Sequence, residues 1–187
     1  MIEKMINESV DVKNKVKLKL SKKIEESANL IISSLKKGNK VLIAGNGGSA
    51  ADAQHFAAEL VGRFRLERKA LPCIALTTDT SIITAWANDY NFETLFERQI
   101  EALGKEGDMF IGISTSGNSQ NIINAIKKSK ELGLNTIALL GKEGGKTKGL
   151  ADMELIIPSD NTPRIQESQI MILHIICELI ENSLFEK

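Results

Sequence analysis

The sequence is poor in aromatic residues and carries no net charge. Phe, Trp and Tyr make up 4% of its 187 residues, and its 24 Lys and Arg residues are balanced by 24 Asp and Glu residues. Proteins that bind nucleic acid neutralise phosphates with an excess of basic side chains, and they often stack bases on aromatic rings. We therefore do not expect nucleic acid as a partner.

Long apolar runs are missing as well. No segment reaches the roughly 18 consecutive apolar residues of a transmembrane helix. Residues 1–8, MIEKMINE, lack the uninterrupted apolar stretch of a signal peptide. These two absences predict a cytoplasmic protein that has no membrane partner.

Cysteine is almost absent too, since the chain has only two. Cys73 lies in the run LPCIAL and Cys177 in the run IICELI, so both sit among apolar residues and neither belongs to a CxxC motif. We expect two reduced, buried thiols and neither a disulfide nor a cysteine metal site.

What the sequence does contain is an alternation of short apolar runs with longer amphipathic stretches. Apolar runs without polar alternation are typical of strands buried on both faces of a parallel sheet. Their alternation with helical patterns predicts a doubly wound α/β fold, with helices on both faces of the sheet. The expected strands are residues 40–44, 72–76, 109–113, 136–140 and 155–157.

Helical patterns occupy both ends of the chain. The first 37 or so residues are rich in Lys and Glu, have apolar residues at helical spacing and end at Lys36-Lys37-Gly38, which predicts a helix or a helix pair. Residues 165–184 form another long pattern that is apolar on more than one side, so this helix is expected to be buried in the core or between subunits. No internal repeat or linker is visible, and we expect a single domain over residues 1–187.

A glycine-rich loop, AGNGGS at residues 44–49, directly follows the first expected strand and opens a helix. Its spacing does not match the GxGxxG pattern of dinucleotide sites. Glycines let the backbone approach a ligand closely, and the amides at a helix start favour an anion or a polyhydroxyl substrate. A plain strand-to-helix turn is the alternative at this stage.

A hydroxyl-rich loop, STSGNS at residues 114–119, follows the third expected strand and leads into a helix expected from Gln120 to Leu132. Hydroxyl and amide donors at the positive end of a helix suit a phosphate monoester. The loop has no GK(S/T) ending, which argues against a P-loop nucleotide site. A simple helix cap needs only one hydroxyl. Four hydroxyls therefore favour phosphate binding.

Acid–base residues lie on two expected helices. His55 and Glu59 are spaced i,i+4 in a helix expected over residues 49–61, so they share one face. Such a pair can bind a metal or move protons, although a surface pair that merely stabilises the helix has the same spacing. His174 interrupts the apolar C-terminal helix, where it is either a functional group or a hydrogen-bonded core histidine. Gln166 lies roughly 80° around the same helix from His174, so both fit one broad face.

Four segments, taken in order along the chain, resemble the phosphoheptose isomerases, a family within the SIS-domain group. They are NGGSAADAQHFAAE from Asn46, AND at residues 87–89, STSGNS from Ser114, and RIQE from Arg164 followed by His174. The resemblance covers essentially the whole chain and implies a flavodoxin-like sheet of five parallel strands. It also implies conversion of sedoheptulose 7-phosphate to D-glycero-D-manno-heptose 7-phosphate, which supplies heptose for bacterial lipopolysaccharide or capsule.

The resemblance further implies roles for particular residues. Glu59 would be the base and His174 its acid–base partner in a reaction that passes through an enediol(ate). The implied contacts are, for the sugar, Asn46, Gly47, Gly48, Glu59, Asn88, Asp89 and Gln166; for its phosphate, Ser114, Thr115, Ser116 and Ser119; and for one zinc ion per subunit, His55, Glu59, Gln166 and His174. The family also implies a homotetramer. One departure is Gln169, which stands where a second histidine is expected and leaves open any further proton relay or metal contact there.

Two non-catalytic alternatives share this fold. SIS adaptor proteins that bind the bacterial replication initiator DnaA have a similar glycine loop, the first histidine and the RIQE segment, but they lack the Glu and the final His. Because Glu59 and His174 are both present, catalysis is favoured over the adaptor role. Sugar-phosphate-sensing regulatory domains normally come joined to a DNA-binding or enzyme domain, for which 187 residues leave no room. Whether Glu59 serves as zinc ligand or as free base stays open.

Overall fold

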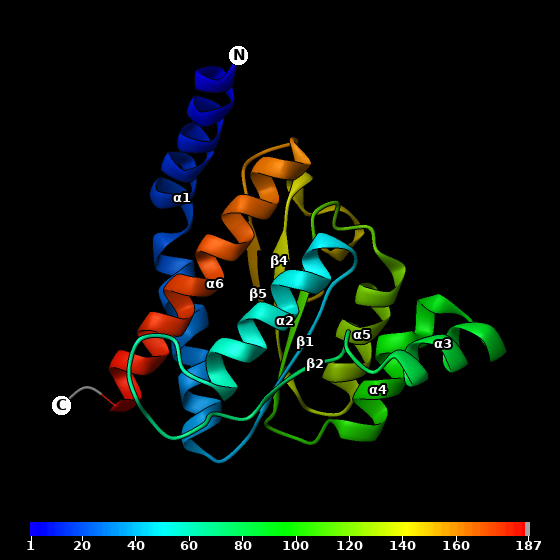
Figure 1. Cartoon of the computed structure of the whole chain (residues 1–187). Coiled ribbons are helices and arrows are strands. Elements are labelled where there is room, and N and C mark those ends of the chain that lie inside the picture. Colours follow the sequence, from blue (N-terminus) through cyan, green and yellow to red (C-terminus); the bar gives the residue numbers. More distant parts are fainter. Residues whose placement is uncertain (186–187) are drawn as a thin grey trace.

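In a computed structural model, the chain folds into one parallel sheet with helices packed on both faces (Figure 1). The structure describes residues 1–185. The strands are β1 (Val41–Ala44), β2 (Cys73–Ala75), β3 (Met109–Ser114), β4 (Asn135–Leu140) and β5 (Met153–Ile156). All five expected strands are present, and their bounds shift by two residues at most. The prediction of a doubly wound α/β fold is confirmed.

The strand order is β2-β1-β3-β4-β5, and every neighbouring pair is parallel. This is the flavodoxin-like order that the family resemblance implies. The order reverses between β1 and β3, because the chain leaves these two neighbouring strands in opposite directions across the sheet. In open α/β sheets, ligands bind in the crevice outside the carboxyl ends of the strands at such a point. The glycine-rich loop follows β1 there, and the hydroxyl-rich loop follows β3.

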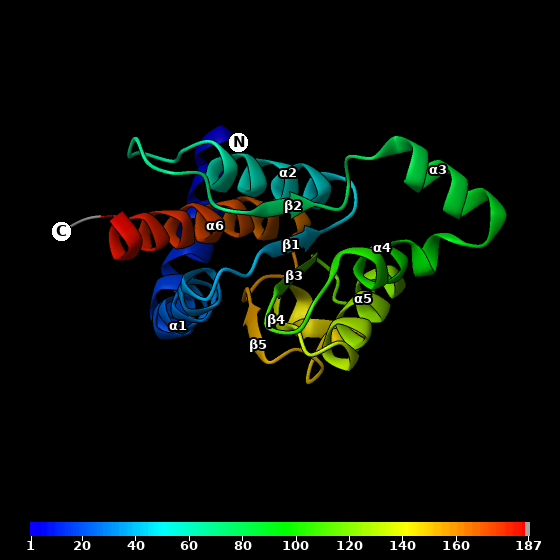
Figure 2. The same ribbon diagram turned by 90° about the horizontal axis from the view of Figure 1, so that it is seen from below.

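The helices form a layer on each side of the sheet (Figure 2). Their bounds are α1 (Ile2–Lys36), α2 (Gly48–Val61), α3 (Thr80–Asp89), α4 (Leu95–Leu103), α5 (Gln120–Glu131) and α6 (Thr162–Phe185). Because side chains alternate along a strand, Ile43 and Ile111 pack under α1, α2 and α6, whereas Leu42 and Phe110 pack under α4 and α5. Both helical layers bury fully apolar strand residues, which explains the lack of polar alternation in the sequence.

The N-terminal segment is one continuous helix, so the helix-pair alternative is wrong. Its buried residues begin at Val12, and from there α1 packs against α6. The preceding turns extend beyond the sheet at the N-terminal end in Figure 1. The helix ends as its sequence predicts, since Gly38 adopts a φ of 78° and donates its N–H to the Leu35 carbonyl at 3.0 Å.

The C-terminal helix α6 packs into the core, as expected. Ile165, Ile172 and Ile176 are completely buried against the sheet. Of the described helices, α6 alone is long and apolar enough to cross a membrane. The core helix of a soluble protein can have the same length and composition, and α6 packs against the sheet as such a helix does. Cys73 and Cys177 are free and buried, as expected, and burial raises the pKa of both thiols.

Candidate active site

The glycine-rich and hydroxyl-rich loops meet at the point where the strand order reverses. Asn46 follows β1, and Asn121 lies in the first turn of α5. Their side-chain amides exchange two hydrogen bonds, each 2.9 Å long. This reciprocal pair connects the glycine-rich loop to the start of α5, and it fixes the orientation of Asn46, one of the predicted substrate contacts.

Gly47 and Gly48 of the glycine-rich loop are each required for a different structural reason. Gly47 is the N-cap of α2 and adopts a φ of 56°, a left-handed conformation that glycine adopts without strain. Gly48 lies against the side chain of Gln166 from α6, and a Cβ at this position would overlap the Gln166 amide. The loop therefore does more than turn the chain, because Gly48 lets α6 bring a predicted zinc and substrate residue next to the start of α2.

The hydroxyl-rich loop is held in shape by its own side chains. The Ser114 and Ser119 hydroxyls are 3.0 Å apart, the Gly117 N–H donates to the Ser114 hydroxyl, and the Asn118 N–H donates to the Ser116 hydroxyl. Ser119 is the N-cap of α5 but makes no side-chain capping hydrogen bond with any described residue. The capping alternative therefore fails for Ser119, and its hydroxyl lies at the positive end of α5 without that role.

A second segment supports the hydroxyl-rich loop from behind. Thr147 donates both its backbone N–H and its hydroxyl to the Gly117 carbonyl, at 2.9 and 2.7 Å. The Lys146 N–H donates to Asn118 Oδ1 at 3.0 Å. The shape of the hydroxyl-rich loop therefore depends on a segment about thirty residues further along the chain, a contact that the sequence pattern did not reveal.

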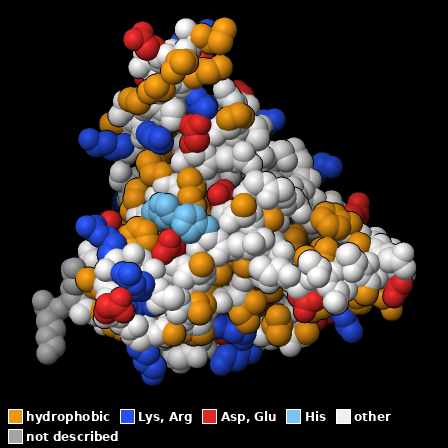
Figure 3. Space-filling view, viewed as in Figure 1, with side chains coloured by type: hydrophobic (Ala, Val, Ile, Leu, Met, Phe, Trp, Pro, Cys, Tyr) orange, Lys and Arg blue, Asp and Glu red, His pale blue; other side chains and the backbone are white. Residues whose placement is uncertain are grey.

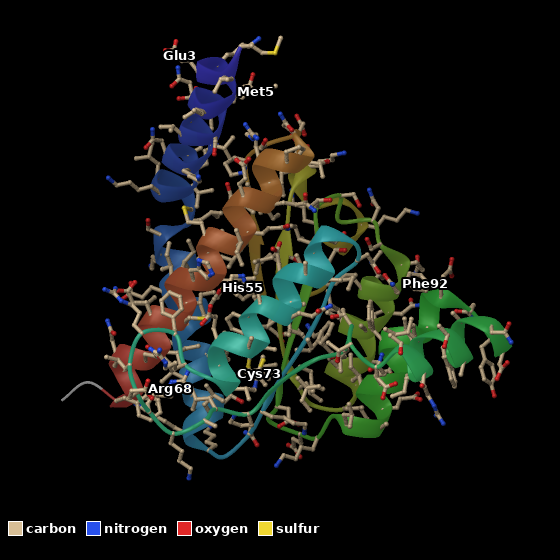
Figure 4. The ribbon with its side chains drawn as sticks, in the orientation of Figure 1. Glu3, Met5, His55, Arg68, Cys73 and Phe92 are labelled. Atoms are coloured by element: carbon tan, nitrogen blue, oxygen red, sulfur yellow. The ribbon has the colours of Figure 1, made fainter. Side chains whose placement is uncertain are left out.

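The acid–base residues of α2 and α6 form one cluster. His55 Nε2 lies 2.9 Å from Glu59 Oε1 and 3.4 Å from His174 Nε2. The two imidazole rings meet edge to face, with their centroids 4.9 Å apart. Figure 3 shows the two histidines, the only ones in the chain, as a single patch open to the surface, and Figure 4 shows His55 between α2 and α6. His174 is therefore not an isolated core histidine.

The cluster has donor types that bind zinc, in a group compact enough to hold a metal ion. One nitrogen or oxygen donor from each of His55, Glu59 and His174 lies within 4.8 Å of the other two. Zinc binds such donors at about 2.0–2.2 Å in a tetrahedron, which separates neighbouring donors by roughly 3.4 Å. The distance between the two histidine nitrogens, 3.4 Å, matches this value, whereas His55 Nε2 and Glu59 Oε1 are closer, at 2.9 Å. The protein residues therefore fit zinc, and Gln166 lies two turns before His174 on the same helix.

Two further residues at the cluster were missed by the sequence analysis. The Phe64 ring packs against the His174 ring, with their centroids 5.5 Å apart. Asp52 lies one turn before His55, and burial raises its pKa from 3.8 to about 6, opposed by the charge of His55. Its Oδ2 atom is buried without a hydrogen-bond partner among the described residues. The i,i+3 spacing of Asp52 and His55 was the available signal, whereas nothing in the sequence pointed to Phe64.

Two of the predicted substrate residues lie elsewhere. Asn88 and Asp89 are the last residues of α3, which projects away from α2 and α6 in Figure 2. Both side chains are exposed, and they hydrogen-bond to each other at 2.8 Å. Within a single chain, Asn46 bonds to the start of α5, Gly48 lies against Gln166, and the two histidines and Glu59 form the cluster. Asn88 and Asp89 lie apart from all of these, at the end of α3.

Known proteins resemble the chain over nearly its whole length. The family model described as the SIS domain matches residues 5–141. The phosphoheptose isomerase of Clostridium acetobutylicum is 55% identical to it over 187 residues, which cover 98% of this chain and 95% of that protein. The phosphoheptose isomerase of Helicobacter pylori is 56% identical over 90% of this chain and 88% of that protein. This chain belongs to the phosphoheptose isomerase family.

Solved structures of the phosphoheptose isomerase family have the same fold. The enzyme of Neisseria gonorrhoeae superposes with a TM-score of 0.92 at 42% identity and covers 97% of each chain. The enzyme of Francisella tularensis gives a TM-score of 0.94 at 40% identity, over 97% of this chain and 96% of the other. The family membership makes the protein an isomerase and supports the choice of an enzyme over the two non-catalytic alternatives.

Proposed function

We propose that this protein converts sedoheptulose 7-phosphate to D-glycero-D-manno-heptose 7-phosphate, a heptose precursor for bacterial surface polysaccharide. The observation that carries the proposal is the cluster of His55, Glu59 and His174, which brings acid–base groups from two helices together in one surface patch. The family membership supports the substrate, since its members are named for a phosphorylated heptose.

The proposed chemistry moves protons between neighbouring atoms of the open-chain sugar. Glu59 removes a proton from C1 of the ketose, and the electron pair moves toward the C2 carbonyl to give an enediol(ate). His174 transfers a proton from the oxygen on C1 to the oxygen on C2. Glu59 then returns its proton to C2, which leaves an aldehyde at C1 and a hydroxyl at C2. No oxidant or reductant is consumed.

The proposed zinc site uses His55, Glu59, Gln166 and His174. A bound zinc ion would supply Lewis acidity that polarises the carbonyl oxygen and stabilises negative charge on the enediolate. Glu59 is already hydrogen-bonded to His55 and only 21% of its side chain is exposed, so the orientation of its carboxylate is restrained. A restrained Glu59 carboxylate suits either role, as a zinc ligand or as the base.

The proposed substrate site extends from the cluster to the hydroxyl-rich loop. Ser114, Thr115, Ser116 and Ser119 are the proposed phosphate contacts, and Asn46, Gly47 and Gly48 lie beside the sugar. Ser114 is buried and its hydroxyl is bonded to that of Ser119. In this proposal Ser114 maintains the shape of the loop as well as contacting the phosphate. Supporting this site, neutral donors at a helix start bind phosphate without a lysine.

We further propose a single-domain cytoplasmic enzyme that assembles as a homotetramer. Supporting the assembly, α3 buries none of its residues within the chain, and it exposes Ile82 and, just after its end, Tyr90. A second copy packed on α3 would cover this apolar surface. Such packing would also let Asn88 and Asp89 contribute to the substrate site of the second copy, since they lie away from the cluster of their own chain.

The deciding experiment is incubation of the purified protein with sedoheptulose 7-phosphate, with product followed by chromatography against an authentic aldose phosphate standard. We expect turnover that falls on chelation and returns with added zinc. Glucose 6-phosphate and fructose 6-phosphate are the comparison substrates, and we expect little conversion of either. No turnover with or without zinc, together with tight binding to the replication initiator DnaA, would replace the proposal with the adaptor role.

A further inference from the structure

A buried ion pair lies at the opposite end of the α2–α6 contact from the glycine-rich loop. Arg68, in the segment between α2 and β2, donates from Nε to Glu181 Oε1 at 2.9 Å, and both side chains are only 1% exposed. Figure 4 shows Arg68 where this segment passes the C-terminal part of α6. Buried ion pairs contribute little net stability, because desolvation offsets their attraction. This pair therefore needs another explanation.

The carboxylate of Glu181 organises the whole segment. Its two oxygens accept hydrogen bonds from the backbone N–H groups of Phe64, Arg65 and Leu66, at 2.9 to 3.0 Å, in addition to the bond from Arg68. These bonds lower the pKa of Glu181 against the opposing effect of burial. Three consecutive amides on one carboxylate fix the local backbone, and Phe64 is the residue that packs on His174.

The guanidinium of Arg68 binds the other helix of the cluster. It donates to the backbone carbonyls of Glu59 at 2.6 Å and Leu60 at 2.7 Å, which belong to the last turn of α2. Glu59 is the residue whose carboxylate contacts His55. Glu181 lies seven residues after His174, two turns along the same face of α6. One ion pair thus links the backbone of Glu59, the face of α6 that carries His174, and the Phe64 ring.

We propose that Arg68 and Glu181 are positioning residues for the active site. They hold the last turn of α2 at a fixed distance from α6, and they keep Phe64 against His174, so that the three donors of the cluster stay at zinc-binding separation. The catalytic part of this inference rests on the proposed isomerase function. Groups that orient metal ligands typically change metal affinity or activity by 10- to 100-fold when they are removed.

The test compares Glu181→Gln and Arg68→Lys with a matched control on the same two segments. Arg65 and Glu178 also form an ion pair between this segment and α6, but their side chains are 65% and 44% exposed. We expect each buried-pair variant to lower zinc affinity and kcat by roughly tenfold or more, with KM changed by less than about threefold. Arg65→Lys and Glu178→Gln should match the parent protein in all three.

A readout without metal or substrate separates this inference from the proposed function. The chain has two histidines, so their imidazole C–H signals in the NMR spectrum of the metal-free protein are readily assigned. We expect the His174 signals to move in Glu181→Gln and Arg68→Lys, because the Phe64 ring shifts. If the parent protein does not isomerise sedoheptulose 7-phosphate, the proposed function is wrong. The histidine signals and the zinc affinities of the variants would still test the positioning role of Arg68 and Glu181.

A purely structural ion pair predicts a different result. The folded variants would then unfold at a lower temperature, yet at 25 °C they would keep the parent's zinc affinity, kcat and histidine signals, and that result would overturn the inference. If Glu181→Gln and Arg68→Lys do not fold, Phe64→Leu decides, because it removes only the ring on His174. Unchanged zinc affinity in Phe64→Leu would then refute the positioning role.

Discussion

At the scale of single residues, Glu59 and His174 carry the most specific prediction. Glu59→Gln and His174→Gln keep approximate size and hydrogen-bonding capacity, so the packing of α2 and α6 should survive. Each should lower kcat by roughly a hundredfold or more, the usual scale for losing a positioned proton-transfer group, with a smaller change in substrate binding. Steady-state kinetics and zinc content, measured on the same samples, check this.

The zinc measurement separates two explanations of a lower kcat. If the residues act mainly as ligands, both variants lose zinc, and if they act mainly as proton carriers, they keep it. Glu178→Gln, an exposed carboxylate on α6, is the control and should behave as the parent. Near-normal turnover in either folded variant would remove the role assigned to that residue.

Asp52 gives a prediction about pH. Its folded pKa is about 6, above the ordinary value of 3.8, so the folded protein holds a proton that the unfolded chain releases between about pH 4 and pH 6. Stability is therefore lost as pH rises through this window. Asp52→Asn, which cannot ionise, should be more stable than the parent at pH 7.5 by roughly 1 to 2 kcal/mol, since solvent screening at this half-buried side chain reduces the full effect. The difference should shrink toward pH 4.

Urea unfolding of the metal-free proteins at several pH values measures this difference. Asp79→Asn is a poor control, because Asp79 caps α3 through its side chain. Asp11→Asn, an exposed aspartate on α1, serves instead and should show no such pH-dependent gain. An Asp52→Asn stability difference that does not vary with pH would show that Asp52 titrates normally.

At the scale of elements, the hydroxyl-rich loop between β3 and α5 acts as a unit. Ser116→Ala removes a hydroxyl that also accepts the Asn118 N–H, and Ser119→Ala removes one that bonds Ser114. Each should weaken binding of the sugar phosphate by about 1 to 3 kcal/mol, because a donor to phosphate at the helix start is lost. KM and inorganic phosphate inhibition constants measure the loss.

The matched hydroxyl control for this loop is Ser21→Ala. Ser21 is exposed on α1, and among the described residues its hydroxyl bonds only the Lys17 carbonyl of its own helix. Circular dichroism should show that all three variants remain folded. If Ser116→Ala and Ser119→Ala both bind the sugar phosphate as the parent does, the loop is not the phosphate site.

At the scale of the whole molecule, the exposed surface of α3 leads to a prediction about assembly. We expect a native mass about four times the 20.5 kDa of the chain, measured by light scattering after size-exclusion chromatography. Ile82→Asp combined with Tyr90→Asp should lower that mass and leave the helix content unchanged, because neither residue is buried within the chain. A double variant that keeps the parent's mass would place the interface elsewhere.

The sequence by itself determined the fold class, the five strands and the pairing of His55 with Glu59 on one helix face. Apolar runs without polar alternation predicted strands covered on both faces, since a parallel sheet buries both sides of each strand. The i,i+4 spacing placed His55 beside Glu59, because helix geometry is local and regular. The two loops were recognisable because each directly follows an apolar strand and precedes a helix, and because the second carries more hydroxyls than a helix cap needs.

Only the tertiary structure decided which residues meet across elements. His174 reaches His55 because α2 and α6 pack side by side, and a separation of 119 residues leaves no periodic signal of that contact. The same holds for Arg68 and Glu181, 113 residues apart, and for Thr147 behind Gly117. Such contacts depend on how layers pack around the sheet, which local spacing does not encode. Asn88 and Asp89 show the converse, since a matching motif did not place them near the cluster of their own chain.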